Sequence, residues 1–69
     1  MSNPVYKTID LVGTSNISWK DAAKMAIDVA AKTIHGLQVA EIKDVDMKVR
    51  DGKVVTYWAR VAISFKLDD

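Results

Sequence analysis

The dipeptide Asp51-Gly52 separates two long stretches of strand-forming residues, 37–50 and 53–67. A two-residue type I′ turn needs positive φ at both central positions, and Asp-Gly is among the sequences that adopt it most readily. We therefore predict a β-hairpin over residues 37–67, which is nearly half of the 69-residue chain. Any fold for this sequence must accommodate a hairpin with unusually long strands.

The two strands of this hairpin differ in their apolar pattern. In the second, apolar side chains occupy every other position: Val55, Tyr57, Ala59, Val61, Ile63, Phe65 and Leu67. In the first, Ala40 and Ile42 follow one phase, and the apolar residues from Val45 onward follow the other. Because side chains alternate across a strand with a period of two, this change of phase predicts a bulge or sharp bend near Lys43-Asp44.

A strand and a helix are expected before the hairpin. Residues 5–12 alternate and are rich in β-branched side chains, so we predict a strand that Gly13 ends. The resulting order of strand, helix, strand and strand predicts an α+β fold. In it a three-stranded antiparallel sheet is partly wrapped around one helix, and residues 1–69 form a single domain.

The helix is predicted from helical spacing of apolar residues between Trp19 and His35. Ser18 is its expected N-cap and Gly36 its expected C-cap. Trp19 should pack the start of the helix onto the core. The face that the spacing buries is mostly alanine, which lets a sheet approach closely.

One helix can cover only one face of such a sheet, so the other face is expected to need a partner. That face carries Val54, Thr56, Trp58, Arg60, Ala62, Ser64 and Lys66 on the last strand. A chain of 69 residues without cysteine has no disulfides to stabilise it, which leaves self-assembly. An identical subunit is therefore the expected partner. Two alternatives are that Trp58 is an isolated surface aromatic residue, or that this face binds another protein.

The charge pattern excludes several classes of partner. Ten basic and nine acidic residues are evenly mixed and give a net charge of +1, so neither nucleic acid nor an anionic membrane is expected as a partner. The sequence shows no long apolar run and no secretion signal, which predicts a soluble, cytoplasmic protein.

The sequence contains no catalytic constellation, so we do not expect an enzyme. No Ser or Cys nucleophile has a base nearby, and the only histidine, His35, is expected at the end of the helix, where capping is favoured over catalysis. The carboxylates of Asp44 and Asp46 share one side of a strand. They are interpreted as a solvated strand face, with a hard cation held at a subunit axis as the alternative, and no metal site is predicted within the chain.

The chain resembles the dodecin family over nearly its whole length. The resemblance rests on the order and spacing of several short segments: Val5-Tyr6-Lys7, Leu11-Val12-Gly13-Thr14-Ser15, Ala30-Ala31-Lys32-Thr33-Ile34, Val39-Ala40-Glu41-Ile42, Asp46-Met47, Asp51-Gly52-Lys53-Val54 and Ser64-Phe65-Lys66. It implies a β-α-β-β subunit that assembles into a hollow homo-dodecamer. It also implies a non-enzymatic function, the binding and storage of flavins such as riboflavin or FMN between subunits.

The resemblance places the flavin-binding positions at Val39, Glu41 and Trp58. Flavin-binding dodecins have a stacking tryptophan where this chain has Val39, and a glutamine where it has Trp58, whereas Glu41 is retained. Loss of a stacking platform weakens ligand binding by about 1–3 kcal/mol per ring. Trp58 either offers a ring to the ligand from the opposite strand or fills the pocket itself. The leading hypothesis is flavin or a related heterocycle as the ligand, and the alternative is a dodecameric shell without flavin that binds cations at its symmetry axes.

Overall fold

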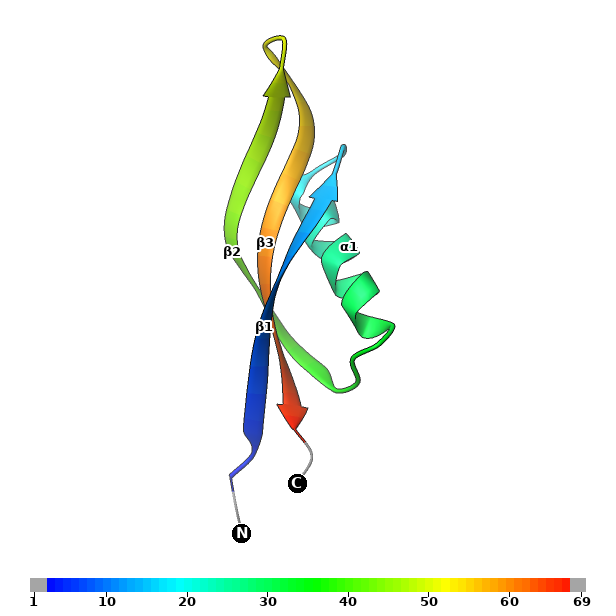
Figure 1. The fold of residues 1–69 in the computed structure, drawn as a ribbon, viewed down its shortest axis with the longest axis vertical. Coiled ribbons are helices and arrows are strands. Elements are labelled where there is room, and N and C mark those ends of the chain that lie inside the picture. Colours follow the sequence, from blue (N-terminus) through cyan, green and yellow to red (C-terminus); the bar gives the residue numbers. More distant parts are fainter. Residues whose placement is uncertain (1–2, 68–69) are drawn as a thin grey trace.

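The computed structural model describes residues 3–67. The chain forms β1 (Val5–Ser15), α1 (Trp19–Ala31), β2 (Leu37–Arg50) and β3 (Lys53–Leu67). The strands make one antiparallel sheet in the order β1-β3-β2, so β3 is central and the other two strands are edges. Figure 1 shows α1 along one side of the sheet and the β2–β3 hairpin extending well past the helix. The predicted β-α-β-β fold is confirmed.

The hairpin turn has the predicted backbone conformation. Asp51 has a φ of 51° and Gly52 a φ of 75°. Asp51 is the only non-glycine residue between positions 3 and 67 that has a positive φ. The turn therefore satisfies the requirement of type I′ geometry at both positions.

The predicted irregularity near Lys43-Asp44 is also confirmed. The register of β2 against β3 shifts between Ile42, which pairs with Val61, and Asp44, which pairs with Arg60. As a result Val45 pairs with Ala59, so the apolar residues on both sides of the bulge lie on the face that carries Ala59 and Val61. The bulge thus keeps Ala40, Ile42 and Val45 on the helix side of the sheet despite their change of phase.

A second irregularity changes the predicted position of Val54. The register shifts again between Lys48 and Val49, and it places Val54 opposite Val49. The alternation that puts Trp58 and Thr56 on one face therefore does not continue to the tip, and the prediction that Val54 belongs to the same face was wrong. The bulge inserts one extra residue, Val55, into β3 at this point.

The prediction that Gly13 ends the first strand was wrong. β1 continues to Ser15, and Gly13 lies buried inside it. A Cβ at Gly13 would collide with the carbonyl oxygen of Ala22 and would lie 3.1 Å from the Cβ of Ala26. Gly13 is therefore the point where α1 meets the sheet most closely.

The helix begins as predicted but ends earlier. The side chain of Ser18 accepts a hydrogen bond from the backbone N–H of Asp21, at 3.0 Å. At the other end α1 stops at Ala31, and the N–H groups of Lys32 and Thr33 bond to carbonyls three residues back, each at 3.2 Å. These tighter bonds close the last turn without glycine. The predicted capping roles of Gly36 and His35 were therefore wrong: both residues lie in the connection to β2.

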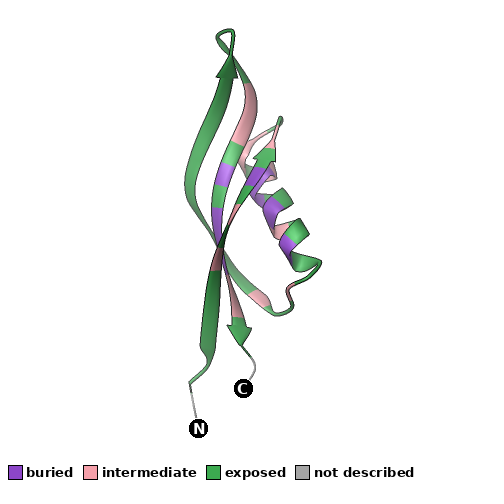
Figure 2. Cartoon of the chain, in the orientation of Figure 1, coloured by how far each residue is buried: buried purple, intermediate pink, exposed green. Residues whose placement is uncertain are grey.

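The core lies between the inner face of α1 and the middle of the sheet. Its buried hydrophobic residues are Ala22, Ala23, Ala26, Ala30, Ala59, Val61 and Ile63. The alanine stripe predicted from the sequence is thus confirmed as the contact surface of the helix. Figure 2 shows the buried residues gathered where α1 crosses β1 and β3, whereas the turn of the hairpin and almost all of β2 are exposed.

Candidate functional site

We call the sheet face opposite to α1 the bare sheet face. It is built from four rows of side chains in which residues of β1, β3 and β2 oppose one another: Thr8–Ser64–Val39, Asp10–Ala62–Glu41, Val12–Arg60–Asp44 and Thr14–Trp58–Asp46. No helix or strand formed by residues 3–67 lies over these rows (Figure 1). The one face that carries all the site residues predicted from the sequence is therefore open to a partner.

The structure places Val39, Glu41 and Trp58 on this face but does not bring all three together. Val39 and Glu41 are adjacent on the same side of β2 and lie opposite Ser64 and Ala62. Trp58 is four residues from Ala62 along β3, which corresponds to about 13 Å at the rise of a strand. The three residues lie in the first, second and fourth of these rows, so a ligand that touches all three has to span all four rows or receive groups from different subunits.

The exposure of these side chains is unusual for large apolar residues. Val39 is 59% exposed and Trp58 is 41% exposed, and both lie on a surface that also carries Val12. A tryptophan with this much accessible ring surface has a flat, apolar face for stacking or for packing against protein.

Carboxylates occupy three neighbouring rows of the bare sheet face. Asp10 and Glu41 lie on either side of Ala62, Asp44 lies opposite Arg60 and Asp46 lies opposite Trp58. Arg60, the cation in the row of Asp44, is weakly engaged: its Nε is 3.9 Å from Oδ2 of Asp44, and both side chains are more than half exposed. Within residues 3–67 no group of three or more acidic or imidazole side chains is close enough to hold a metal ion. The described part of one chain therefore does not form a complete cluster of metal ligands on this face.

The backbone beneath Asp46 is held from the helix side. The indole N–H of Trp19 donates a 3.0 Å hydrogen bond to the carbonyl oxygen of Asp46. The ring of Trp19 also packs edge-to-face against Tyr57, with centroids 5.3 Å apart and planes at 78°. The prediction that Trp19 packs the helix start onto the sheet is confirmed. The indole–carbonyl bond was not predicted, because helical spacing gives the side of the helix but not the partner atom.

Two shallow cavities flank the helix. One, of about 160 Å³, lies beside β2 and includes Val39 among its lining residues, which are otherwise Ile27, Leu37, Gln38, Ala40 and Ile63. The other, of about 260 Å³, lies between β1 and α1. Neither cavity contains Glu41 or Trp58. The cavities are thus separate from the carboxylates and the tryptophan of the bare sheet face.

The overall shape is too extended for a self-sufficient globule. The accessible surface is 5371 Å², whereas a compact monomer of this mass has about 4,300 Å². The radius of gyration is 14.5 Å, against about 11 Å for a compact domain of this length.

In the part of the chain that the structure describes, no helix has the length and apolar character needed to cross a membrane.

Comparison with known proteins identifies clear relatives. The family model for dodecins matches residues 5–68. The calcium dodecin of Mycobacterium tuberculosis is 38% identical over 63 residues, which are 91% of this chain and 89% of the relative. Its crystal structure is described as that of a calcium-chelating antigen with a calcium-binding site. It superposes with a TM-score of 0.81 at 40% identity, covering 93% of this chain and 91% of the other.

A second solved structure matches the fold more closely at lower identity. The dodecin of Streptomyces davaonensis superposes with a TM-score of 0.91 at 31% identity, covering 99% of this chain and all of the other. The two structures therefore span the whole of the fold described above.

Proposed function

Because the chain belongs to the dodecin family, we propose that it is the subunit of a hollow homo-dodecamer with a non-enzymatic, ligand-binding and storage function. The observation that carries this proposal is the open bare sheet face with its exposed Trp58. The accessible surface exceeds that of a compact monomer by about 1,100 Å². A typical stable interface buries about 800 Å² on each partner, so the excess matches what neighbouring copies would remove.

Native mass spectrometry tests the assembly directly. A subunit of 7.6 kDa predicts a particle of twelve copies, about 91 kDa. The intrinsic fluorescence of a Trp19→Phe variant, in which Trp58 is the only tryptophan, should shift to the blue on assembly as water leaves the ring. A folded species of 7.6 kDa at micromolar concentration, with Trp58 emission typical of a wetted ring, would contradict the proposal.

For the ligand, the carboxylates of the bare sheet face favour a hard cation, with Ca²⁺ first. Glu41, Asp44 and Asp46 on β2, together with Asp10 on β1, present exposed oxygen donors of the kind that Ca²⁺ prefers. The relative at 38% identity is a calcium dodecin, which supports the same ligand class for this chain. Residues 3–67 of one subunit hold no cluster of three carboxylates, so these residues would bind Ca²⁺ where copies meet. When bound, the ion would neutralise carboxylates that otherwise repel one another across the junction.

Isothermal titration calorimetry, with Ca²⁺ added to chelator-treated protein, tests whether the protein binds Ca²⁺. Glu41→Gln and Asp44→Asn remove one donor charge each, and each is expected to weaken Ca²⁺ binding at least tenfold. Asp28→Asn is the matched control, because Asp28 is an exposed carboxylate on α1, away from the bare sheet face. Equal Ca²⁺ affinities for the control and both site variants would show that the carboxylates of β2 do not bind Ca²⁺. If the wild-type protein shows no binding heat with Ca²⁺, then Ca²⁺ is excluded as the ligand.

A flavin is the second candidate, supported by the exposed ring of Trp58 on the same face as Val39 and Glu41. Val39 stands where flavin-binding relatives are expected to have a stacking ring, so Trp58 has to supply the stacking contact. Titration of the protein into riboflavin or FMN should then quench flavin fluorescence, and Trp58→Leu should weaken binding by about tenfold or more, since stacking contributes about 1–3 kcal/mol per ring. Unquenched fluorescence at micromolar flavin would exclude this ligand and leave the Ca²⁺ proposal intact.

A further inference from the structure

The part of β2 that carries Asp44 and Asp46 has little within its own strand to fix it. We call residues 44–46 the acidic segment. β2 pairs with β3 alone, and its register shifts on both sides of this region, just before Asp44 and just after Lys48. Every residue of β2 after Leu37 is exposed. A strand at a sheet edge, with irregular pairing and few buried contacts, opens more easily than a central strand.

The carboxylate of Asp46 has no partner of its own to orient it. Among residues 3–67 it makes no hydrogen bond and no ion pair, whereas the carboxylate of Asp44 has the weak contact with Arg60. Asp44 and Asp46 lie about 7 Å apart along the same side of the strand, so their charges repel each other. The direction in which Asp46 points therefore depends on how its backbone is held.

One hydrogen bond from the helix holds the backbone of Asp46. The indole N–H of Trp19 donates it to the carbonyl oxygen of Asp46, at 3.0 Å and across 27 positions of sequence. Within the described residues, no other side chain donates a hydrogen bond to the backbone of β2. The carbonyl carbon and Cβ of Asp46 are bonded to the same Cα. Fixing the carbonyl on the helix side therefore restricts the carboxylate on the bare sheet face.

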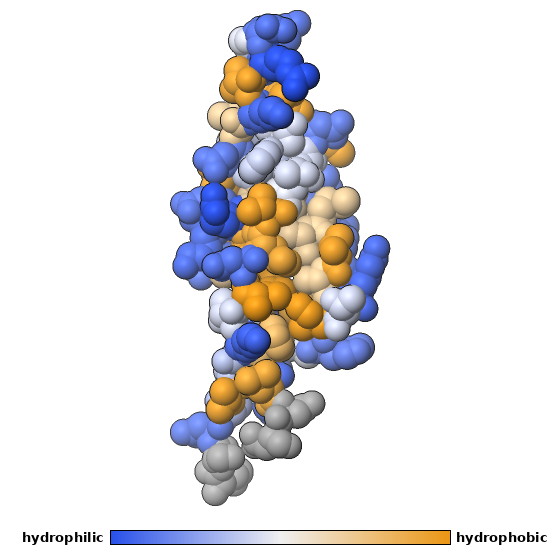
Figure 3. All heavy atoms as spheres, in the orientation of Figure 1, coloured by the Kyte–Doolittle hydropathy of each residue, from blue (hydrophilic) through white to orange (hydrophobic). Residues whose placement is uncertain are grey.

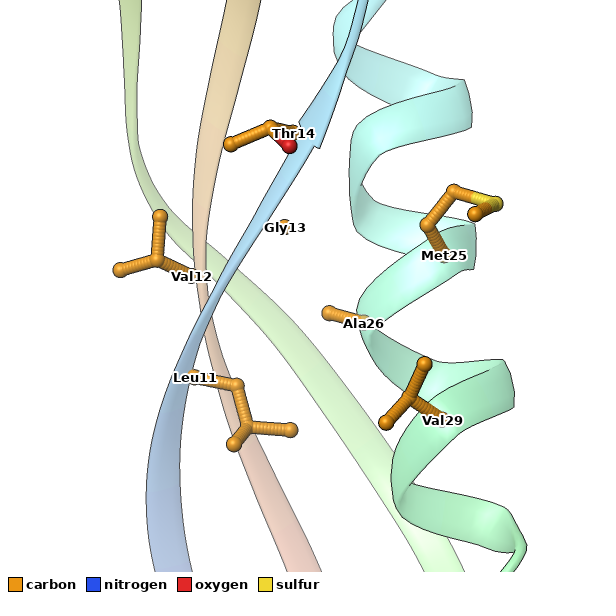
Figure 4. A pocket seen from close by; sticks show the side chains of 7 residues that line it. All are labelled: Leu11, Val12, Gly13, Thr14, Met25, Ala26 and Val29. Atoms are coloured by element: carbon orange, nitrogen blue, oxygen red, sulfur yellow. The ribbon is translucent and has the colours of Figure 1, made fainter.

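Trp19 can act as an anchor because it belongs to the well-packed part of the subunit. Its ring packs edge-to-face against Tyr57, with centroids 5.3 Å apart. Figure 3 shows hydrophobic side chains gathered over the junction of sheet and helix. Figure 4 shows that junction from close by, with Ala26 pointing toward β1 near Gly13, where the missing Cβ lets the helix approach. The indole donor is thus attached to a helix that lies in a fixed position on the sheet.

We propose that Trp19 is a positioning residue for the Ca²⁺ ligands of the acidic segment. The indole does not touch the ion. It holds the carbonyl of Asp46 from the helix side and so keeps the carboxylates of Asp46 and Asp44 in the arrangement that binds Ca²⁺ on the bare sheet face. The inference rests on the proposed Ca²⁺ function and adds to it a residue on the opposite side of the sheet.

The geometry that Ca²⁺ requires sets the size of the effect. Its oxygen ligands lie at about 2.3–2.6 Å, so a displacement of β2 by about 0.5 Å is enough to disturb a bond. Groups that orient metal ligands without touching the metal typically contribute about ten- to a hundredfold to affinity. The acidic segment is exposed and supplies only part of the proposed donors. We therefore expect the lower end of this range, about tenfold.

Calorimetric titration of Ca²⁺ into chelator-treated protein tests the role of the indole. Trp19→Phe keeps an aromatic ring against Tyr57 but has no N–H group, and it should weaken Ca²⁺ binding by about tenfold. The matched control is Ser18→Ala, which removes the helix N-cap and destabilises the start of α1 but leaves the indole donor in place. The control should bind Ca²⁺ as tightly as the wild-type protein.

Hydrogen exchange in the wild-type protein gives a second test that needs no variant. If the bond between indole and carbonyl favours Ca²⁺ binding, then Ca²⁺ favours that bond by the same factor. The indole N–H of Trp19 should therefore exchange about tenfold more slowly when Ca²⁺ is bound. The amide of Val61, a fully buried residue of the core, is the reference for any general stabilisation of the subunit. A bond that only supports the fold predicts equal slowing at both sites.

The outcomes separate the inference from the function on which it rests. If the wild-type protein binds no Ca²⁺, the proposed ligand and the inference both fail. If the wild-type protein binds Ca²⁺ and Trp19→Phe binds it equally tightly, or Ser18→Ala loses as much affinity as Trp19→Phe, the inference is overturned while Ca²⁺ stands as the ligand. Indole exchange that slows no more than exchange at Val61 would overturn the inference in the same way.

Discussion

The helix-covered centre of the subunit and the hairpin extension, by which we mean residues 47–56, belong to the same strands but differ in what surrounds them. At the centre, Ala59, Val61 and Ile63 of β3 are at most 1% exposed beneath α1. In the hairpin extension, Met47 and Val49 are about half exposed although they lie on the same side of the sheet as those residues. The sequence pattern thus indicates which face of a strand is apolar. How much of that face is covered depends on the length of the helix, which reaches the centre but not the hairpin extension.

This difference separates two sources of stability. The centre is stabilised within one chain, by close packing of a sheet against alanine. In the proposed assembly, the hairpin extension and the bare sheet face would be stabilised where another copy removes them from water. Substitutions at the centre should therefore destabilise the subunit itself, and substitutions elsewhere should act mainly on assembly and ligand binding.

The largest effect is expected from Ile63→Ala. Ile63 is one of the two largest fully buried side chains, so its truncation leaves a cavity under the helix and should lower the free energy of unfolding by about 2–5 kcal/mol. Val5→Ala is the control, because Val5 is 54% exposed at the start of β1. Both are measured by chemical denaturation at one fixed protein concentration. Equal losses would show that the centre is not the main source of subunit stability.

Gly13→Ala should come next, because it tests how closely helix and sheet approach. The added methyl group would collide with the carbonyl of Ala22, so the helix has to move away from β1. Such overpacking typically costs about 1–3 kcal/mol. Thr14→Ala, on the next and exposed position of β1, should change the free energy of unfolding by less than about 0.5 kcal/mol. A neutral or stabilising Gly13→Ala would mean that the close approach is not required.

A smaller loss is expected from Trp19→Phe at the border between the two regions. Phenylalanine keeps an aromatic ring against Tyr57 but cannot donate to the carbonyl oxygen of Asp46. Loss of one such hydrogen bond should cost about 0.5–1.5 kcal/mol, together with faster amide exchange in the neighbouring residues of β2. Trp58→Phe, on the other face of the sheet, should leave that exchange unchanged. Unchanged exchange in Trp19→Phe would show that the indole does not hold β2.

Most of the fold was predictable because it depends on local pattern. Asp51-Gly52 predicts its turn through backbone sterics, and the phase change near Lys43 predicts its bulge through the period of a strand. Gly13 was misassigned because a glycine that ends a strand and a glycine that admits a helix look alike in sequence. The start of the helix was predictable because Ser18 caps it through a local side-chain hydrogen bond. Its early end at Ala31 was not, because that end is closed by backbone hydrogen bonds that leave no sequence signature.

The candidate site was less predictable because its residues come from three different strands. Alternation places Glu41 and Trp58 on one face, but only the register shows that they belong to different rows. The register also places Asp10 of β1 in the same row as Glu41, a pairing between residues 31 positions apart that no local motif encodes. The proposed Ca²⁺ site is still harder to predict from one sequence, because each chain would hold only part of its donors.

The smallest change in stability, with a measurable change in binding, is expected from Arg60→Gln on the bare sheet face. The pair with Asp44 spans 3.9 Å in solvent, so its loss should alter the free energy of unfolding by less than about 0.5 kcal/mol. Removal of the guanidinium charge should nevertheless favour Ca²⁺. A unit charge about 8 Å from a divalent ion in water repels it by about 1 kcal/mol, which corresponds to about fivefold in affinity. Calorimetric titration at low ionic strength measures this gain, which should shrink as salt is added.

Lys66→Gln is the matched control for this charge effect. Lys66 lies on the same strand and face, six residues from Arg60, or about 20 Å along β3. That separation exceeds the screening length of about 8 Å at physiological ionic strength, so Lys66→Gln should leave Ca²⁺ affinity unchanged. Equal gains from both variants would indicate a diffuse charge effect in place of a site beside Asp44. A weaker affinity in Arg60→Gln would show that Arg60 orders Asp44 for binding, and the bare sheet face would then be organised by its own ion pair, much as the centre is organised by its packing.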